Sequence, residues 1–279
     1  MIACYAHRFG PVVPVSPTGP IVLYHRPLLS VVCTLVLAWQ AFADSPIVTA
    51  ANRDEALGRP SDPPGVFREE PTVIAPRDGT AGGTWIGYNE AGVFVAITNR
   101  WVDREGDRSR GQLVADCLGC RSANEAVDHV QQSVIRDRYA GFNLVVADAD
   151  SAVFLEWDGE LSITDFEPGV HVIVNVGADG DFFEPDARPE VGRQQAGNAT
   201  VLRTALAPEP DEAAVDWLDR AGAALGDHEY GVCVHGDGFG TRSASLIRLA
   251  AGSAELVDHY RFADGPPCRT EFERVDARL

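Results

Sequence analysis

Lysine is absent from the 279 residues, so all 23 basic side chains belong to arginine. Without lysine the chain can have no Schiff-base lysine, no lysine general base and no P-loop lysine. The 41 acidic residues leave a net charge of −18, which argues against nucleic acid as a partner, because a phosphate backbone is held by clustered cations. Salt screens the repulsion between the many acidic side chains, so we expect a halophilic archaeal source and a cytoplasmic location.

Cysteines are few and scattered, at positions 4, 33, 117, 120, 233 and 268, which does not resemble a secreted disulfide framework. Cys117 and Cys120 form a single C-x-x-C motif. This motif matches either half of a zinc site, with Cys233 and His235 as the other half, or a redox pair. A single such pair is a weak signal, so we predict neither a metal nor a cofactor. The histidines that show no ligand spacing are interpreted as structural: His129, His171, His228 and His259.

Acidic residues are also missing before Asp44, which sets the first 32 residues apart. Three interpretations compete: a secretory signal cleaved after Ala41–Ala43, a lipid-modified Cys33, and a wrongly assigned start with translation beginning at Val31 or Val32. We favour the third, because the segment that follows is a core strand. The expectation is an extraneous extension, residues 1–32, and a single domain, residues 33–279.

The segment from Cys33 to Glu55 predicts two strands joined by a turn at Asp44. If these strands are antiparallel, Cys33 at the head of the first and Arg53 at the tail of the second lie at the same edge of the sheet. A thiol beside a cation is the arrangement in which proteins favour a thiolate.

The remaining elements favour an α+β fold, in which two mainly antiparallel sheets stack face to face with helices outside, a four-layer αββα sandwich. The proline- and glycine-rich segment Asn52–Pro76 is interpreted as a loop. Helices are predicted at Ser109–Leu118, Ser122–Arg138, Pro189–Leu206 and Asp211–Leu225, the second opened by a capping box and carrying an apolar stripe that includes Ile135. Further strands are predicted at Thr84–Asn89, Gly92–Thr98, Phe142–Ala147, Ala152–Trp157, Val170–Val176, Tyr230–His235, Ser243–Ala250 and Ala254–Phe262.

Cys33 is either a small buried hydrophobe or an N-terminal nucleophile whose own α-amine acts as the base. The α-amine has an unperturbed pKa of about 7.7–8.0, so it can accept the thiol proton near neutral pH. Arg53 and Asp54 form either a solvated turn or part of the site. In the second case Arg53 stabilises a thiolate or binds a substrate carboxylate, and Asp54 holds the α-amine.

Three more side chains follow or begin strongly apolar segments. Asn99 and Asn175 are either strand-capping residues or neutral donors to an oxyanion. Arg242, in a glycine-rich turn, is either a surface residue or a second cation over the site.

Four ordered motifs resemble the NRDE family, also called the Transport and Golgi organisation protein 2 family. They are ANRDE, GGTWIGYNEAGVFVAITN, SRGQLV and GFGTRSASLI, and the likeness covers Cys33 to about Leu249. A more distant resemblance is to the N-terminal cysteine amidohydrolases of the penicillin V acylase and choloylglycine hydrolase group, which have the four-layer fold. Their nucleophile and supporting residues would fall on Cys33, Arg53, Asp54, Asn99, Asn175 and Arg242. Arg53 and Asp54 are adjacent here, whereas the amidohydrolases separate these residues by two positions.

The resemblance implies hydrolysis of a non-peptide C–N amide bond through a thioester at Cys33. The alternative is a non-catalytic carrier that binds haem or a lipid-like ligand, because eukaryotic members of the family are linked to such trafficking. In both cases we expect a small, anionic ligand and no stable membrane span, and the oligomeric state stays open.

Overall fold

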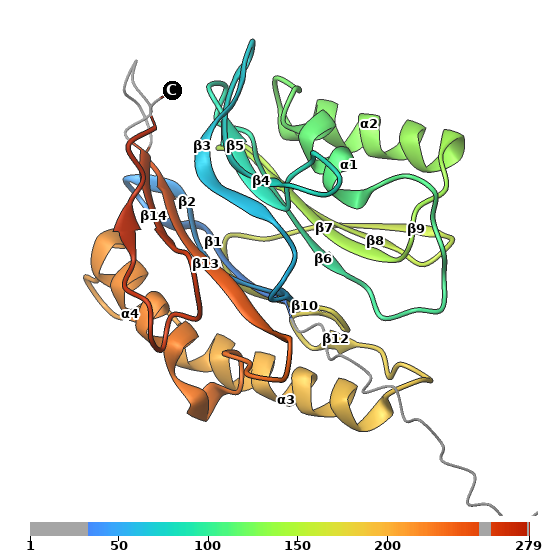
Figure 1. Ribbon diagram of the computed structural model, residues 1–279. Coiled ribbons are helices and arrows are strands. Elements are labelled where there is room, and N and C mark those ends of the chain that lie inside the picture. The colour runs from blue at the N-terminus through green and yellow to red at the C-terminus, as the bar shows by residue number, and fades with distance from the viewer. Residues whose placement is uncertain (1–32, 251–257, 278) are drawn as a thin grey trace, which may run out of the picture.

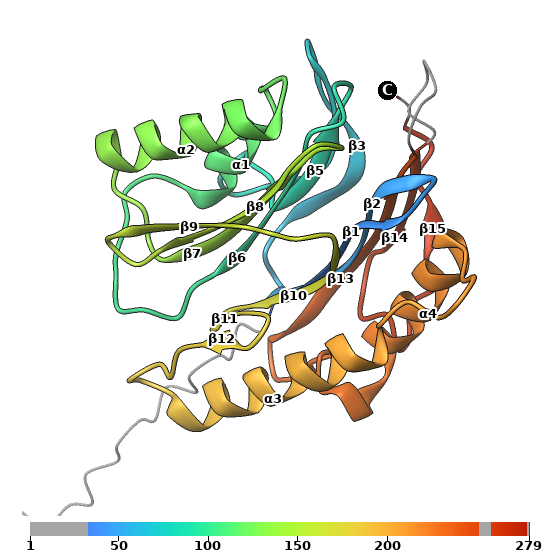
Figure 2. The same cartoon turned by 180° about the vertical axis from the view of Figure 1, so that it is seen from behind.

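The computed structural model describes residues 33–250, 258–277 and 279, and these residues form four layers (Figure 1). Two antiparallel sheets face each other, α1 and α2 cover the outer face of one, and α3 and α4 cover the outer face of the other (Figures 1 and 2). The predicted αββα sandwich is therefore confirmed. The predicted boundary after residue 32 lies outside the described residues and stays a prediction.

The first sheet has the strand order β12-β11-β10-β1-β2-β13-β14-β15. Its strands are β1 (Thr34–Phe42), β2 (Ser45–Ala56), β10 (Gly169–Val174), β11 (Gly177–Ala178), β12 (Asp181–Phe182), β13 (Phe239–Leu249), β14 (Asp258–Ala263) and β15 (Glu273–Arg274). The predicted hairpin is its centre: Thr34 is paired with Asn52, so Cys33 and Arg53 do lie at the same edge.

The second sheet has the strand order β3-β4-β5-β6-β7-β8-β9. Its strands are β3 (Ser61–Glu69), β4 (Thr72–Asp78), β5 (Ile86–Asn89), β6 (Phe94–Asn99), β7 (Phe142–Ala147), β8 (Ala152–Trp157) and β9 (Leu161–Asp165). Each strand pairs with its neighbour in the chain, and the connections are turns or short loops except between β6 and β7, where the chain forms the two helices α1 and α2.

The four helices are α1 (Arg110–Cys117), α2 (Ala123–Arg136), α3 (Pro189–Ala205) and α4 (Ala214–Gly226). Ser122 caps α2 by accepting a hydrogen bond from the backbone N–H of Glu125, as the capping box predicts. A short 3₁₀ turn, η1 (His228–Tyr230), follows α4. Among the described residues, no helix has both the length and the apolar character needed to cross a membrane.

Side chains of β1 alternate between two cores, as the two-residue period of a strand requires. Leu35 and Leu37 point into the core between the sheets, whereas Val36 and Ala38 pack with Trp217 of α4. A third core lies between the second sheet and the helices α1 and α2. Because β1 is buried on both faces, it reads as a continuous apolar run in the sequence.

The prediction of a loop at Asn52–Pro76 is wrong, because β2 continues to Ala56 and is followed by β3 and β4. Pro63 and Pro64 are accommodated because β3 is an edge strand whose register is irregular at these two residues. An edge strand need not donate every N–H to a neighbour.

Smaller corrections concern other segments. The strand predicted at Tyr230–His235 is wrong, because η1 and a loop occupy this segment. Ile135 is 87% exposed and does not belong to the apolar stripe of α2. Strand β9 was not predicted, since its residues are mostly exposed and lack an apolar run. The predicted strand from Ala254 begins at Asp258, and residues 254–257 lie outside the described part of the chain.

Candidate active site

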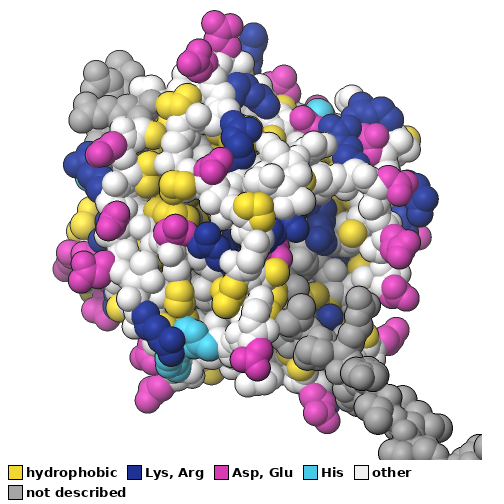
Figure 3. Space-filling view, viewed as in Figure 1, with side chains coloured by type: hydrophobic (Ala, Val, Ile, Leu, Met, Phe, Trp, Pro, Cys, Tyr) yellow, Lys and Arg dark blue, Asp and Glu magenta, His cyan; other side chains and the backbone are white. Residues whose placement is uncertain are grey.

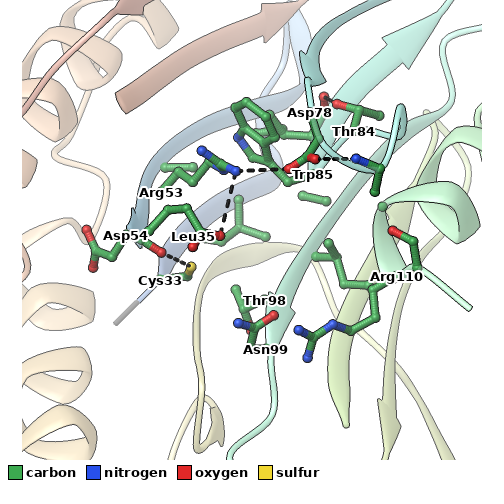
Figure 4. A pocket seen from close by; sticks show the side chains of 18 of the residues that line it. Cys33, Leu35, Arg53, Asp54, Asp78, Thr84, Trp85, Thr98, Asn99 and Arg110 are labelled. Atoms are coloured by element: carbon green, nitrogen blue, oxygen red, sulfur yellow. Dashed lines mark hydrogen bonds and ion pairs between the residues drawn. The ribbon is translucent and has the colours of Figure 1, made fainter. Parts of the chain in front are cut away.

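A cavity of about 430 Å³ lies where β1 and β2 of the first sheet meet β6 and the start of α1. Figure 4 shows Cys33, Arg53 and Asp54 on one side and Thr98, Asn99 and Arg110 on the other. The polar side chains that reach its lining include Cys33, Arg53, Glu55, Arg59, Asp78, Thr84, Thr98, Asn99, Arg108, Ser109, Arg110, Ser243 and Ser245. In the space-filling view several arginines lie near the middle of the face shown, while acidic side chains are scattered around it (Figure 3).

Cys33 precedes β1 at the edge of this cavity and is half-buried. Its backbone N–H donates to Oδ1 of Asn175 at 2.9 Å, and its Sγ lies 3.7 Å from the carbonyl oxygen of Asp54. Burial and the negative charge of Asp54 raise the pKa of the Cys33 thiol to about 12, against the opposing effect of Arg53. With a peptide bond on its nitrogen, Cys33 is therefore a protonated thiol, and its nucleophilicity depends on a base.

Arg53 reaches into the cavity from β2 with little freedom to move. Its Nη2 lies 3.3 Å from Oδ2 of Asp78, and its guanidinium carbon lies 3.9 Å from the centre of the Trp85 ring. Burial lowers the pKa of Arg53, and the nearby Glu55, Cys33 and Asp78 counteract this effect. Its Nη1 is buried and has no hydrogen-bond partner among the described residues, so its two N–H groups remain for a ligand.

The Asp54 side chain lies on the opposite face of β2 from Arg53, because adjacent residues in a strand point to opposite faces. Its Oδ1 accepts a hydrogen bond of 2.5 Å from Thr241 Oγ1, while Oδ2 is buried and has no partner in the described part of the chain. Burial raises the pKa of Asp54 well above its ordinary range, with a smaller opposing effect from Thr241. Asp54 thus contacts Cys33 through its carbonyl oxygen, and the Cys33 nitrogen is held by Asn175 instead.

Arg242 is not brought together with the other predicted residues. The pairing of β2 with β13 slips between Thr241 and Ser243, so Ser243 lines the cavity and Arg242 forms an ion pair with Asp264. A bulge of this kind re-aims one side chain of a strand.

The two asparagines play different structural parts. Asn175 is fully buried, with Oδ1 accepting from Cys33 N and Gln195 Nε2, and Nδ2 donating to the Asn99 carbonyl at 2.6 Å. Asn99 lines the cavity, and its side-chain amide has no hydrogen-bond partner among the described residues. Asn99 is therefore the asparagine with an amide free for a ligand oxygen.

Arg110 is a cavity residue that the sequence-based predictions did not include. It is the first residue of α1, and its Nη1 donates to the Gly141 carbonyl at 2.7 Å. Four arginines line the cavity in the described chain, and Arg110 is the one that has no carboxylate within ion-pair distance. Burial lowers the pKa of Arg110, whereas Cys33 and Glu55 act in the opposite direction.

The position of Arg110 is set by a contact between two of the sequence motifs. A Cβ atom on Gly83 would lie 2.2 Å from the Gly111 carbonyl carbon, so only glycine fits there. The Thr84 N–H donates to the Gly111 carbonyl at 3.0 Å. The GGTW and SRGQLV motifs therefore meet at the beginning of α1. Arg110 belongs to the SRGQLV motif, and this membership is the sequence signal that could have identified it.

Cys117 and Cys120 lie away from this cavity, in the core beneath α1 and α2. Their sulfur atoms face the carbonyl oxygens of Ala126 and Asp116, and burial raises the pKa of both thiols. The zinc site considered above as one alternative, Cys117 and Cys120 with Cys233 and His235, is not formed, because Cys233 and His235 lie beside His228 and Cys268 instead.

Comparison with known proteins agrees with the motifs. The sequence model of the family described as Transport and Golgi organisation 2 matches residues 32–197, more than half of the chain. The chain belongs to this family. It is 27% identical over 263 residues to the Transport and Golgi organization protein 2 homolog of Bos taurus, covering 84% of this chain and 92% of that protein.

Two solved structures of amide-cleaving enzymes are similar in three dimensions. The N-acylethanolamine-hydrolyzing acid amidase ortholog of Caenorhabditis elegans has a TM-score of 0.51 and 11% identity, over 77% of this chain and 92% of that one. Penicillin V acylase from Agrobacterium tumefaciens has a TM-score of 0.48 and 13% identity, over 88% and 98%. At this identity the likeness concerns the fold: this family member has the fold of the N-terminal nucleophile hydrolases.

Proposed function

We propose that the protein is an N-terminal cysteine amidohydrolase that cleaves linear amides carrying an anionic group. The observation that carries the proposal is the thiol of Cys33 at a cavity of about 430 Å³. Its nitrogen is fixed by Asn175, and Arg110 in the same cavity has no carboxylate partner among the residues that the structure describes. The similarity in fold to the acid amidase supports the same reaction class.

The reaction begins when the α-amine of Cys33, as the first residue, takes the thiol proton. The sulfur attacks the amide carbonyl carbon, and the oxyanion is stabilised by the unpartnered amide of Asn99. The C–N bond then breaks, and the proton passes from the α-amine to the leaving amine. Water hydrolyses the thioester, which releases the acid and restores the thiol.

The raised pKa of Cys33 explains why the α-amine is essential to this scheme. A thiol with a pKa of about 12 has almost no thiolate at neutral pH, and the carboxyl of Asp54 points to the other face of the sheet. An α-amine with a pKa of about 7.7–8.0 would lie directly on the nucleophilic residue.

The test compares a chain that begins at Cys33 with one that retains Val32. Both are assayed with N-acyl amino acids and the matched N-acyl amines, and Cys33→Ala in the shorter chain is the control. We expect turnover by the chain beginning at Cys33 alone, and an acyl adduct on residue 33 in mass spectra of the intact protein. Equal turnover by both chains, or by the alanine variant, would contradict the proposal.

The carrier alternative is distinguished by titration with haemin. Among the described residues that line the cavity, Cys33 is the one side chain of a type that serves as an axial haem ligand. Because the raised pKa of that thiol, about 12, opposes coordination as a thiolate, we expect no Soret shift at micromolar haemin. A stoichiometric shift that Cys33→Ala removes, without amidase activity, would favour the carrier.

A further inference from the structure

Four metal-ligand side chains converge at a second place, beside the loop that follows α4. His228, Cys233, His235 and Cys268 each offer one ligand atom, and these four atoms all lie within 4.8 Å of one another. His228 belongs to η1, Cys233 and His235 to the following loop, and Cys268 to the connection between β14 and β15. Four ligand-type side chains from separate segments therefore share one small volume.

Hydrogen bonding alone does not account for this convergence. Nε2 of His235 lies 3.2 Å from Nε2 of His228, 3.2 Å from Sγ of Cys268 and 3.7 Å from Sγ of Cys233. An imidazole nitrogen carries either one proton or one lone pair, so it has a single hydrogen-bonding direction. Three groups cannot all be satisfied by that one direction, whereas a cation between them would be bound by all four atoms.

Three of the six distances between the four ligand atoms are close to those of a tetrahedral site, and the other three are at most 4.8 Å. With Zn–N bonds of about 2.05 Å and Zn–S bonds of about 2.3 Å, tetrahedral ligand atoms lie about 3.3 Å apart for two nitrogens and about 3.8 Å for two sulfurs. The N–N distance of 3.2 Å and the N–S distances of 3.2 and 3.7 Å fall close to this range. Two sulfur and two imidazole ligands in a tetrahedron are the donor set that selects zinc.

We propose that His228, Cys233, His235 and Cys268 form a structural Zn²⁺ site. All four coordination positions are filled by protein, as in structural rather than catalytic zinc sites. Binding replaces the two thiol protons, which pass to the solvent, and no electron is transferred. Cys233 is buried and the two histidines are exposed, so the ion has a path of entry from the surface.

The zinc-binding loop holds the strand that carries the NRDE motif. Nδ2 of Asn52 donates to the carbonyl of Val232 at 2.8 Å, and Thr241 exchanges hydrogen bonds of 2.9 Å with the backbone of Val234. Thr241 in turn donates to Asp54. Cys233 lies between these two anchor points, so zinc would fix the loop that holds both Asn52 and Asp54.

Metal content of the full chain tests the site. Protein purified under reducing conditions without chelator should contain about one zinc ion per chain by elemental mass spectrometry. The double variant Cys233→Ser, Cys268→Ser should lose it, whereas the matched double variant Cys117→Ser, Cys120→Ser should keep it. His228→Ala changes an exposed ligand, and we expect at least a tenfold weaker hold on zinc in competition with a chromophoric chelator.

Cys233 is buried, so its replacement by serine can destabilise the fold as well as remove a ligand. The wild-type protein therefore supplies an independent measurement. Removal of zinc and reconstitution with Co²⁺ alone should give the absorption bands of a tetrahedral thiolate site, and the zinc-free protein should unfold at a temperature at least about 5 °C lower. The proposal would be overturned by zinc-free native protein without cobalt bands, by zinc retained in the Cys233, Cys268 variant, or by a native Cys233–Cys268 disulfide.

Discussion

The two sides of the cavity differ in how completely their polar groups are bonded. On the strand wall, formed by Cys33, Arg53 and Asp54, each residue has a protein partner, namely Asn175, Asp78 and Thr241 respectively. Only Nη1 of Arg53 and Oδ2 of Asp54 have no partner there among the described residues. On the helix wall, formed by Asn99 and Arg110, the Asn99 amide has no partner among the described residues and Arg110 has only the Gly141 carbonyl. A bonded wall fixes geometry, whereas an incompletely bonded one is available to a ligand.

This difference assigns separate tasks within the proposed enzyme. The strand wall would hold the nucleophile for the chemical step, so changes there should act on thiol reactivity and on stability. The helix wall would bind the anionic part and the carbonyl oxygen of the substrate, so changes there should act on KM.

The largest expected effect concerns the reactivity of Cys33 on the strand wall. In a chain that retains Val32, the pKa of about 12 should make alkylation by iodoacetamide at pH 7.5 on the order of 10³ slower than that of glutathione. In a chain that begins at Cys33, the α-amine should restore reactivity, with a midpoint near pH 8. Peptide mapping after timed quenching measures both rates at Cys33, and buried Cys117 serves as an unreactive reference. Equal rates in the two chains would show that the α-amine does not act on the thiol.

The strand wall was largely predictable from sequence because its order is local. Alternating apolar residues predict β1 and β2, and antiparallel pairing brings Cys33 and Arg53 to one edge. The loop interpretation of Asn52–Pro76 hid the consequence for Asp54. Once β2 is seen to continue to Ala56, two adjacent residues must face opposite sides.

The helix wall and the zinc-ligand cluster could not be predicted in the same way, because both depend on contacts between distant segments. Arg110 reaches the cavity through the packing of Gly111 on Gly83, which no local period encodes. His228 showed no ligand spacing within the chain, since one of its neighbours, Cys268, comes from a different connection. The residue types in the sequence indicated a catalytic cavity and a metal site, but only the fold shows which residues come together in each.

A second prediction addresses the helix wall through Arg110→Gln. We expect KM for an anionic amide to rise about 10- to 100-fold, the value of one or two charged hydrogen bonds, with kcat within about threefold. The neutral N-acyl amine should be unaffected. Unfolding temperature should stay the same or rise, because a buried cation without a carboxylate is costly to fold.

Two further arginines sharpen this measurement. Arg261→Gln removes a cation that is paired with Asp219 outside the cavity, and it should change neither parameter. Arg242→Gln separates the two assignments of the second cation: its pairing with Asp264 predicts an unchanged KM, whereas the family resemblance predicts an increase. An increase for Arg242→Gln with none for Arg110→Gln would reverse our assignment of the helix wall.

The smallest expected effect is the pH dependence of stability due to Asp54. Its pKa is raised in the folded state by burial, so above the unfolded pKa of about 3.9 the folded chain binds one more proton than the unfolded chain. Stability due to this group therefore falls as pH rises from about 4 to the folded pKa, by about 1.4 kcal/mol per pH unit.

Asp54→Asn should remove this contribution while keeping an oxygen that accepts from Thr241. Urea unfolding of the wild type and the variant at a series of pH values from 4 upward gives the difference between their free energies of unfolding, which should change in favour of the variant as pH rises. Asp264→Asn, at an exposed carboxylate, should leave the slope of the wild type unchanged. A constant difference between Asp54→Asn and the wild type would mean that Asp54 is ionised throughout. Asp54 would then be a buried charge with no arginine partner among the described residues. Its role would be electrostatic, and the neutral support inferred from its hydrogen bond with Thr241 would be wrong.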